Sequence, residues 1–252
     1  MIQSVTRALS LLQEVAAKEG TAGVGVRELA RATRLKVSTA QNLLKTLVSR
    51  GFLAFDEESR KYRLGLAAVL LADGASPLER MAAFARPWVD RLATDLQETV
   101  AAAAWFQGQA VIVDWRQAGH ALVATHASRV IAEPQIMASG RTLLAWLSEA
   151  ERAEQARRLV EKRGRPNLPT TIKDFMAMLD AVRRDGVAET RDVAGSGIGA
   201  ASAPVFDASG RLVLAVSCSA PLVRWDAGAR EKAIAAITGA ARQMSAALGA
   251  DA

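Results

Sequence analysis

The apolar periodicity of the first 65 residues changes once, at Gly51, and this change limits the folds open to the chain. Before Gly51 apolar residues recur every three to four positions, which is typical of one face of a helix. After Gly51 two short apolar segments, Phe52–Phe55 and Lys61–Leu64, have the pattern of strands joined by a polar turn at Asp56–Arg60. A group of helices followed directly by a hairpin is therefore predicted.

Three helices are predicted before the hairpin. The apolar stripe of the first is Val5, Leu9, Leu12 and Val15. Ser4 or Thr6 is placed to cap its start. The second helix is Arg27–Ala32, and a tight turn at Thr33–Val37 follows it. The third runs from Thr39 to Arg50, with Ser38 and Thr39 as candidate caps and Gly51 at the position of a C-terminal capping glycine.

Two short helices joined by a tight turn form the core of a helix-turn-helix, and the hairpin supplies a wing. The apolar residues of the third helix turn inward, so its polar residues face outward: Ser38, Thr39, Gln41, Asn42 and Lys45. Gln and Asn side chains make bidentate contacts with adenine in the major groove. Phosphate contacts are expected from Arg34 and Lys36 before the helix and from Arg60 and Lys61 on the wing.

The charge distribution favours the same interpretation. Residues 1–66 carry 11 Lys or Arg and 6 Asp or Glu, a net charge of +5. The rest of the chain carries 21 basic and 20 acidic residues, a net charge of +1. A basic segment attached to a nearly neutral one is typical of a phosphate-binding module joined to a second domain. The alternative is a solvated basic face, which charge alone does not exclude.

The remaining composition removes other classes of protein. A length of 252 residues predicts about two domains, and no apolar run approaches the ~20 residues of a membrane span. The N-terminus lacks an apolar signal segment, so a cytoplasmic protein is expected. The single Cys218 permits no internal disulfide, and no Cys or carboxylate pair joins His120 and His126 in a metal site. We expect no metal and no cofactor.

The C-terminal part has the pattern of an α+β domain. Leu66 to Asp73 is a candidate linker helix, and Pro77 opens a helix over 78–97. Strands are predicted at Thr99–Gln107, Ala110–Arg116, Val187–Ala194, Ile198–Phe206 and Arg211–Ser219. Helices are predicted at Ser139–Glu149, Ala150–Arg163, Asp174–Asp185 and Asp226–Leu248. We therefore expect a domain at 1–65, a linker helix at 66–77 and a domain at 78–252.

An ordered set of motifs resembles the IclR family of bacterial transcriptional regulators. In the N-terminal part it comprises Gln3–Leu9, Glu28–Ala30, Ser38–Leu47, Gly51–Leu53 and Tyr62–Gly65. In the C-terminal part it comprises Ser139–Ala145, Ala203–Asp207 and Ser217–Pro221. The resemblance implies a winged helix-turn-helix followed by a GAF-like domain that binds a small molecule, often an organic acid. It also implies that Asp192 is the acidic residue found in the family's effector site.

The last predicted strand indicates how an acid would be held. Leu212, Leu214, Val216 and Cys218 alternate on one face and suit the core, whereas Val213, Ala215, Ser217 and Ser219 lie on the other. Facing these two hydroxyls, the helix start at Ser139 offers free N–H groups to an anion. The predicted effector site is Ala138, Ser139, Gly140, Asp192, Ala200, Ser217 and Ser219. The alternative is that both serines bond to neighbouring backbone.

Two other motifs are given structural interpretations. The segment Gly195–Gly199 lacks the flanking strand and helix of a dinucleotide-binding loop, so a turn is expected. Cys218 with His126 could suggest a nucleophile, but Cys218 falls on the apolar face of its strand. No catalytic residues are predicted. The predicted function is a regulator that binds double-stranded operator DNA as a homodimer or homotetramer and responds to a small carboxylate, with an aromatic one suggested by Trp105 and Trp115. The alternative is a C-terminal domain that serves only oligomerisation or protein interaction.

Overall fold

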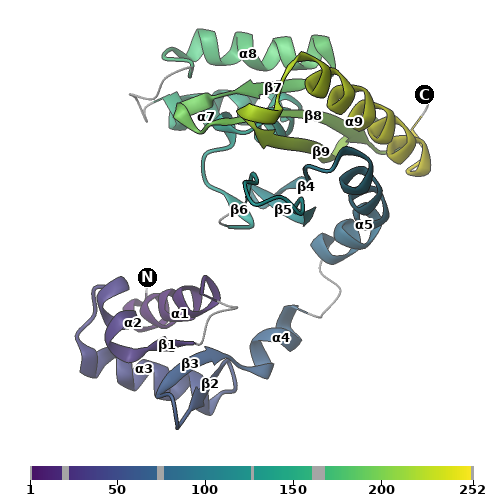
Figure 1. The fold of residues 1–252 in the computed structure, drawn as a ribbon. Coiled ribbons are helices and arrows are strands. Elements are labelled where there is room, and N and C mark those ends of the chain that lie inside the picture. Colours follow the sequence, from purple (N-terminus) through teal and green to yellow (C-terminus); the bar gives the residue numbers. More distant parts are fainter. Residues whose placement is uncertain (1, 19–22, 73–76, 126–127, 161–167, 251–252) are drawn as a thin grey trace. The chain divides into compact units, whose positions relative to one another are not determined.

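The computed structural model describes residues 2–18, 23–72, 77–125, 128–160 and 168–250, and it divides into compact units at 1–76 and 77–252 (Figure 1). Each unit has its own buried core, so each is described by itself. No helix within the described ranges has both the length and the apolar character that a membrane span requires. The expected α+β class, with a winged helix-turn-helix first, is confirmed.

The N-terminal unit is a three-helix core with a small antiparallel sheet. Its helices are α1 (Gln3–Ala16), α2 (Val26–Ala32) and α3 (Val37–Ser49), and α4 (Leu66–Ala72) follows the sheet. Its strands are β1 (Val24–Gly25), β2 (Leu53–Asp56) and β3 (Lys61–Leu64), in the order β1-β3-β2. The predicted helix-turn-helix and hairpin are both present.

The first helix is rotated relative to the expected stripe. Leu11 and Val15 are buried in the core, whereas the side chains of Val5 and Leu9 are 52% and 53% exposed. The apolar residues of α1 cover more than one face, so periodicity alone did not identify the buried one. The predicted cap was also wrong, because α1 begins at Gln3 and no side chain caps it.

The end of α3 forms the glycine cap that the sequence predicts. Gly51 has a left-handed backbone with φ of 72°, and its N–H donates to the Val48 carbonyl at 2.9 Å. The next N–H, of Phe52, donates to the Leu47 carbonyl at 2.9 Å, which completes a Schellman motif. A Cβ on Gly65 would stand 2.2 Å from the Gly51 carbonyl oxygen, so the exit from the wing requires glycine.

The C-terminal unit is built on one six-stranded antiparallel sheet with the order β6-β5-β4-β9-β8-β7. The strands are β4 (Thr99–Phe106), β5 (Gln109–Arg116), β6 (Val130–Ile131), β7 (Ala188–Arg191), β8 (Ile198–Phe206) and β9 (Leu212–Pro221). The helices are α5 (Pro77–Leu96), α6 (Ala138–Ala145), α7 (Glu149–Val160), α8 (Ile172–Asp185) and α9 (Ala227–Ala247). Short 3-10 turns lie at Pro134–Ile136, Val193–Gly195 and Leu222–Arg224.

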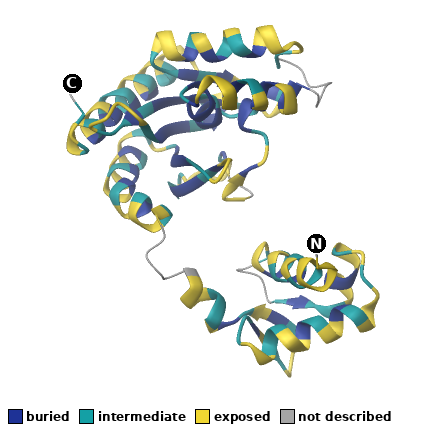
Figure 2. Ribbon diagram, turned by 180° about the vertical axis from the view of Figure 1, so that it is seen from behind, coloured by how far each residue is buried: buried dark blue, intermediate teal, exposed yellow. Residues whose placement is uncertain are grey.

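Helices cover both faces of this sheet, and buried residues fill the space between the layers (Figures 1 and 2). Helices α5 and α9 pack on the face that carries Val216 and Cys218. Helix α6 packs on the opposite face through Leu143, against Ala101 and Ala215. Burial raises the pKa of the Cys218 thiol to about 12, in agreement with the predicted structural role for this residue.

Two irregularities correct the predicted strand faces and lengths. A register shift in the β8–β9 pairing places Leu212 with the α6 cluster rather than with Leu214. A bulge displaces an alternation by one residue and so moves a side chain to the other face. The predicted strand after Val187 stops at Arg191, where the chain turns at Asp192 (φ 49°) into a 3-10 turn. The first residues of the segment Gly195–Gly199 lie in a turn, as expected, and Ile198 and Gly199 begin β8.

Candidate functional site: a DNA-binding surface and an effector site

The outer face of α3 presents most of the polar residues predicted to contact bases. Ser38, Gln41, Asn42 and Lys45 are exposed, while Ala40 and Leu44 on the opposite face are fully buried. Thr39 is half-buried beside them. The helix begins at Val37 with Lys36 as its N-cap, and neither Ser38 nor Thr39 caps it. These hydroxyls lie in the first helical turn instead.

Arg34 occupies a backbone position that favours glycine. It follows α2 in a left-handed conformation with φ of 54°. Its N–H donates to the Arg31 carbonyl at 3.2 Å, and the Leu35 N–H donates to the Ala30 carbonyl at 2.8 Å. This is the same cap that Gly51 forms after α3, but here an exposed arginine fills it. A residue other than glycine in this region costs about 1 kcal/mol of backbone strain.

The wing also places an arginine in the left-handed region. Arg60 has φ of 57° and its guanidinium carbon lies 5.1 Å from the centre of the Phe55 ring. It also pairs with Glu57 at 2.9 Å, so its charge is partly satisfied within the wing. Lys61, one residue on, is half-buried. Within the wing turn, Asp56 accepts the Ser59 N–H at 2.8 Å, and this bond lowers the pKa of Asp56.

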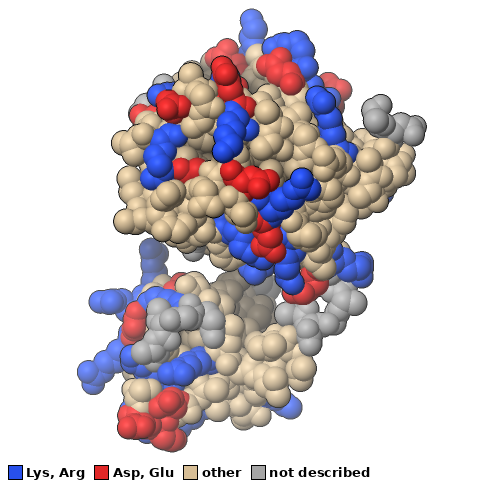
Figure 3. Space-filling model, turned by 45° about the vertical axis from the view of Figure 1, so that its right-hand side comes forward, with Lys and Arg blue, Asp and Glu red and all other residues tan. Residues whose placement is uncertain are grey.

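The distribution of charge differs between the two units. On the face seen in Figure 3, basic side chains project from several sides of the N-terminal unit, whereas basic and acidic side chains lie next to one another on the C-terminal unit. Several of the latter form ion pairs, including Arg230–Glu189 at 2.5 Å and Arg116–Asp90 at 2.5 Å. Such pairing leaves little net charge for attracting phosphate.

The predicted effector site centres on the start of α6. Ala138, Ser139 and Gly140 are all buried there, and no side chain caps the helix. A Cβ on Gly140 would stand 2.1 Å from the Pro134 carbonyl oxygen, so glycine lets the preceding turn pack against the helix. Arg141 supports this packing by donating to the carbonyls of Gln135 at 2.9 Å and Glu189 at 3.1 Å. Burial lowers the pKa of Arg141 to about 10, a value at which the guanidinium is still protonated at neutral pH.

Two rows of paired residues cross the sheet beneath α6. In one row Trp115 pairs with Ala101, Ala101 with Ser217, and Ser217 with Ser202. In the other Thr99 pairs with Ser219, Ser219 with Ala200, and Ala200 with Thr190. Paired residues of antiparallel strands point to the same face. Because Ala101 packs with Leu143 of α6, the first row faces this helix, and the second row, two residues away along each strand, faces the same side.

The hydroxyl groups of these rows are differently engaged. Ser217 donates to the Ala101 carbonyl at 3.3 Å, so for this serine the backbone-bonded alternative is what the structure contains. Thr99 donates to the Ala124 carbonyl at 2.7 Å. The Ser202 hydroxyl is fully buried and has no hydrogen-bond partner among the described residues. Ser219 is half-buried. The rows thus hold one buried hydroxyl, that of Ser202, without a hydrogen-bond partner in the described part of the chain.

Asp192 lies at one end of the second row, in the turn that follows Thr190. Its carboxylate accepts the Gly197 N–H at 2.9 Å and so closes this turn. At the other end of the rows, the Arg129 guanidinium carbon lies 5.3 Å from the centre of the Trp115 ring. His126 lies outside the described residues. Within the described ranges, no three His, Cys, Asp or Glu side chains are grouped as a metal site.

Comparisons with known proteins identify the family. The model of the bacterial transcriptional regulator IclR C-terminal domain matches residues 78–246, and that of the IclR helix-turn-helix domain matches residues 4–57. The chain belongs to the IclR family. KdgR of Escherichia coli is 25% identical to this IclR-family chain, and the match covers 98% of this chain and 93% of KdgR. The glycerol operon regulatory protein of Streptomyces coelicolor is 28% identical over 99% of the chain and 97% of that protein.

Solved structures of IclR proteins share this fold. The Thermotoga maritima IclR structure matches with a TM-score of 0.74 at 21% identity, over 99% of this chain and all of that one. An IclR homolog from Microbacterium hydrocarbonoxydans, complexed with 4-hydroxybenzoate, matches with a TM-score of 0.79 at 19% identity, over 98% and 99% of the two chains. This IclR-family chain is a transcriptional regulator with a helix-turn-helix for DNA.

Several residues beside the predicted effector site of this IclR-family chain were not predicted. Ser202 and Thr190 share the rows of Ser217 and Ser219 only because of the strand register. Alternation in Ala200–Ser202 could have placed Ser202 on the face of Ala200, but no local signal pairs it with Ser217. Arg129 and the Pro134–Ile136 turn fall in a segment for which the sequence predicted no structure.

Proposed function

We propose that this IclR-type regulator binds operator DNA through α3 and the wing of residues 1–65 and releases or reshapes that contact when a small carboxylate binds the domain of residues 78–252. The linker proposed at 66–77, of which the structure describes α4 over Leu66–Ala72, joins the two. The exposed polar face of α3 carries the first half of the proposal. The second half rests on the start of α6, which no described side chain caps, and on the buried Ser202 hydroxyl, which has no hydrogen-bond partner in the described part of the chain.

DNA contact is supported by exposed polar side chains on α3 and by two arginines in left-handed backbone positions. Gln41 and Asn42 are exposed on a helix of suitable length to enter the major groove, and Lys45 lies one turn further along. Arg34 and Arg60 hold glycine-like backbone positions. Strained positions concentrate at functional sites. We propose base contacts for Ser38, Thr39, Gln41 and Asn42, and phosphate contacts for Arg34, Lys36, Lys45, Arg60 and Lys61.

A carboxylate ligand is supported by the chemistry of the α6 face. The N–H groups at the start of α6 attract an anion, and the rows that contain Ser217 and Ser219 include the Ser202 hydroxyl, which has no partner among the described residues, as a donor. Trp115 with Arg129 at the end of the rows would suit a ring that bears the acid. The proposed site is Ala138, Ser139, Gly140, Asp192, Ala200, Ser217 and Ser219, extended by Ser202. We propose no catalytic step there.

A homodimer or homotetramer is supported by apolar side chains on α4. Leu66, Val69, Leu70 and Leu71 are between 54% and 70% exposed. Such a patch marks an interaction surface in a regulator that reads two half-sites. If α4 and the C-terminal domain served oligomerisation alone, small acids would not bind the chain, and this difference separates the two functions experimentally.

The effector half is tested by thermal unfolding of the full chain with a panel of small carboxylic acids that includes 4-hydroxybenzoate. A ligand at about 100 times its dissociation constant adds about 2.7 kcal/mol to the free energy of unfolding. We expect at least one acid to raise Tm and to change operator affinity. If no acid on a broad panel raised Tm, the oligomerisation-only alternative would be preferred.

The DNA half is tested by selecting binding sites from random duplexes with the full chain and measuring affinity by fluorescence anisotropy. We expect a pseudo-palindrome with half-sites about 10 bp apart or a multiple of that. The logarithm of affinity should fall linearly with that of salt concentration, because each phosphate contact releases counterions. Enrichment of no sequence would contradict base readout by α3.

A further inference from the structure

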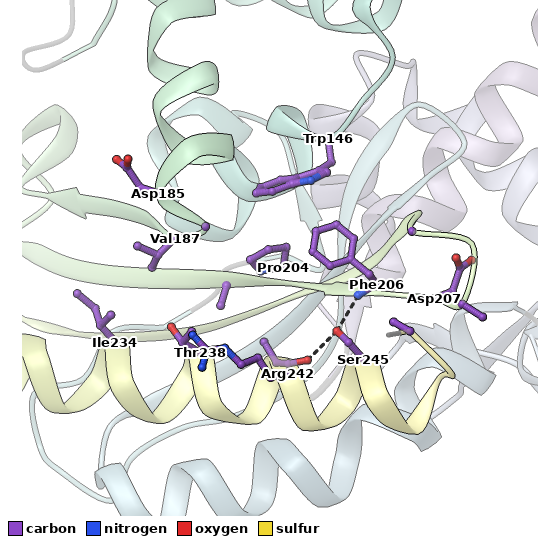
Figure 4. Close-up of a pocket in the computed structure, with 16 residues that line it drawn as sticks. Trp146, Asp185, Val187, Pro204, Phe206, Asp207, Ile234, Thr238, Arg242 and Ser245 are labelled. Atoms are coloured by element: carbon purple, nitrogen blue, oxygen red, sulfur yellow. Dashed lines mark hydrogen bonds between the residues drawn. The ribbon is translucent and has the colours of Figure 1, made fainter. Parts of the chain in front are cut away.

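A cavity of about 880 Å3 lies along the edge of β8. Its walls are the last turns of α9, the end of β8 and the region where α8 leads into β7 (Figure 4). None of the residues proposed for the effector site lines it. Ligand cavities in proteins typically measure about 300–1,000 Å3, so this one has the size of a small-molecule site.

The cavity exists because the sheet is incomplete at this corner. Strand β7 begins at Ala188, which pairs with Ser202, so no strand among the described residues lies beside β8 on that edge from Ala203 onward. The edge does not suit a further strand either. Pro204 has no N–H, and the Phe206 N–H already donates to the Ser245 hydroxyl at 2.9 Å (Figure 4). A small molecule therefore fits this edge better than an extended peptide does.

One wall of the cavity is aromatic. Trp146, just after α6, and Phe206, at the end of β8, meet edge to face with ring centres 5.5 Å apart. Both are half-buried, and Pro204 lies beside them in the view of Figure 4. Aromatic rings gain from such offset or edge-on contacts beyond the area that they bury. This wall favours a planar ring.

The opposite wall carries an unpaired positive charge. Ile234, Thr238 and Arg242 lie on one stripe of α9, and Figure 4 shows Arg242 extending along the helix toward Thr238. No carboxylate within the described residues pairs with Arg242. The two acidic groups of the cavity are already engaged. Asp185 accepts from Arg184 at 3.2 Å.

The other acidic group, Asp207, is held within its own hairpin. It accepts the Ser209 hydroxyl at 2.6 Å and pairs with Arg211 at 3.0 Å. These contacts lower its pKa to about 2, with the Ser209 hydroxyl as the largest cause. The charge left over in the cavity is thus the Arg242 guanidinium, which forms strong bidentate bonds with a carboxylate.

We propose that this cavity is a second ligand site, for an aromatic acid with more than one ring, distinct from the effector site under α6. The ring system lies against Trp146 and Phe206, and the carboxylate binds Arg242 beside the Thr238 hydroxyl. Helix α9 also packs against α5, the first helix after the linker. A ligand in the cavity would therefore contact a helix that packs against α5.

The test uses 2-naphthoate as the probe and calorimetry on the full chain. The wild type should bind it, and Arg242→Gln should weaken binding about tenfold or more, because a charge-assisted bond is lost. Trp146→Leu should also weaken it. Arg157→Gln is the matched control, since Arg157 is an exposed arginine of the same unit outside the cavity. It should bind 2-naphthoate as the wild type does.

Ser217→Val separates this site from the effector site. Binding of 2-naphthoate that survives Ser217→Val but fails in Arg242→Gln supports the second site. Loss in Ser217→Val with none in Arg242→Gln would overturn it and assign the acid to the effector site. Absence of binding would overturn it too. A change of oligomer mass in Arg242→Gln by light scattering would also overturn it and make the cavity a subunit interface.

Discussion

The proposed functional residues of the two units lie in opposite environments. Those of the N-terminal unit are largely exposed and come from one helix, the turn before it and one hairpin. Those of the C-terminal unit are mostly buried and come from α6 and several strands that are far apart in the chain. DNA is a large, charged surface and is met by side chains on a convex helix, whereas a small acid needs donors enclosed on several sides.

The two units differ in the kind of unfavourable feature that the fold tolerates at residues proposed to function, and each such feature has a cost in stability. In the N-terminal unit the cost appears in the backbone, as arginines in glycine-like positions. In the C-terminal unit it appears at Ser202, a buried hydroxyl without a hydrogen-bond partner within the described ranges. Substitutions should therefore separate binding from stability in both units, each in its own way.

The largest effect is expected where the two units would act together. Leu70→Asp places a charge on the exposed apolar face of α4. If this face packs against a partner subunit, the charge becomes buried there without a partner, which costs several kcal/mol. We expect light scattering to show a smaller oligomer, or operator binding to lose its response to effector. Leu70→Met should change neither. Unchanged mass together with unchanged response in Leu70→Asp would remove α4 from the account.

Next in size are the effects of α3 on DNA. Gln41→Ala should cost about 1–3 kcal/mol on the selected operator and little on random DNA, because base contacts carry specificity. Lys45→Ala should weaken binding to both and reduce the salt slope by about one. Both residues are exposed, so Tm should not change. Equal losses on operator and random DNA for Gln41→Ala would contradict its base contact.

At Ser202 a smaller effect is expected, with opposite directions for stability and for ligand binding. Ser202→Ala removes an unpaired buried hydroxyl and should raise the free energy of unfolding by about 1 kcal/mol. It should also weaken binding of the acid found in the panel, about fivefold, because one donor is lost. Chemical denaturation and calorimetry measure the two. Ser196→Ala, on an exposed turn, is the control. Full ligand affinity in Ser202→Ala would show that the hydroxyl does not face the effector.

The smallest effect is the counterpart in the N-terminal unit. Arg34→Gly relieves the left-handed strain and should stabilise the fold by up to about 1 kcal/mol, although added freedom of the unfolded chain opposes part of this gain. The same change removes a cation and should weaken binding to all duplexes. Arg34→Lys keeps the strain and should retain most of the affinity. Weakening that is confined to the operator would argue against a phosphate contact.

The elements that local rules govern were predictable from the sequence. The hairpin strand Lys61–Leu64, the Gly51 cap and the outer face of α3 follow from periodicity and turn chemistry. The stripe of α1 was misplaced because a shift of one position on a helix turns a side chain by about 100°. Strand β8 was predicted at its observed bounds.

The neighbours of β8 were beyond sequence reasoning. Pairing of Thr99 with Ser219, and of Ala200 with Thr190, depends on register across long connections. Bulges at Ala102–Ala103 and at Val205–Phe206 shift that register without any local signal. The effector-site residues on β9 could therefore be proposed from alternation. Their partners on the neighbouring strands could be identified only from the strand pairing in the structure.

The central claim is that the two sites are separate in binding and coupled in effect, and a crossed comparison of Gln41→Ala and Ser217→Val tests it most directly. Operator affinity is measured by anisotropy with and without the acid identified by thermal shift, and acid affinity is measured by calorimetry. Gln41→Ala should lose operator affinity and keep acid affinity. Ser217→Val should keep operator affinity without acid, bind the acid several-fold more weakly and respond to it only at higher concentration. If Ser217→Val bound and responded to the acid as the wild type does, the effector site under α6 would be contradicted.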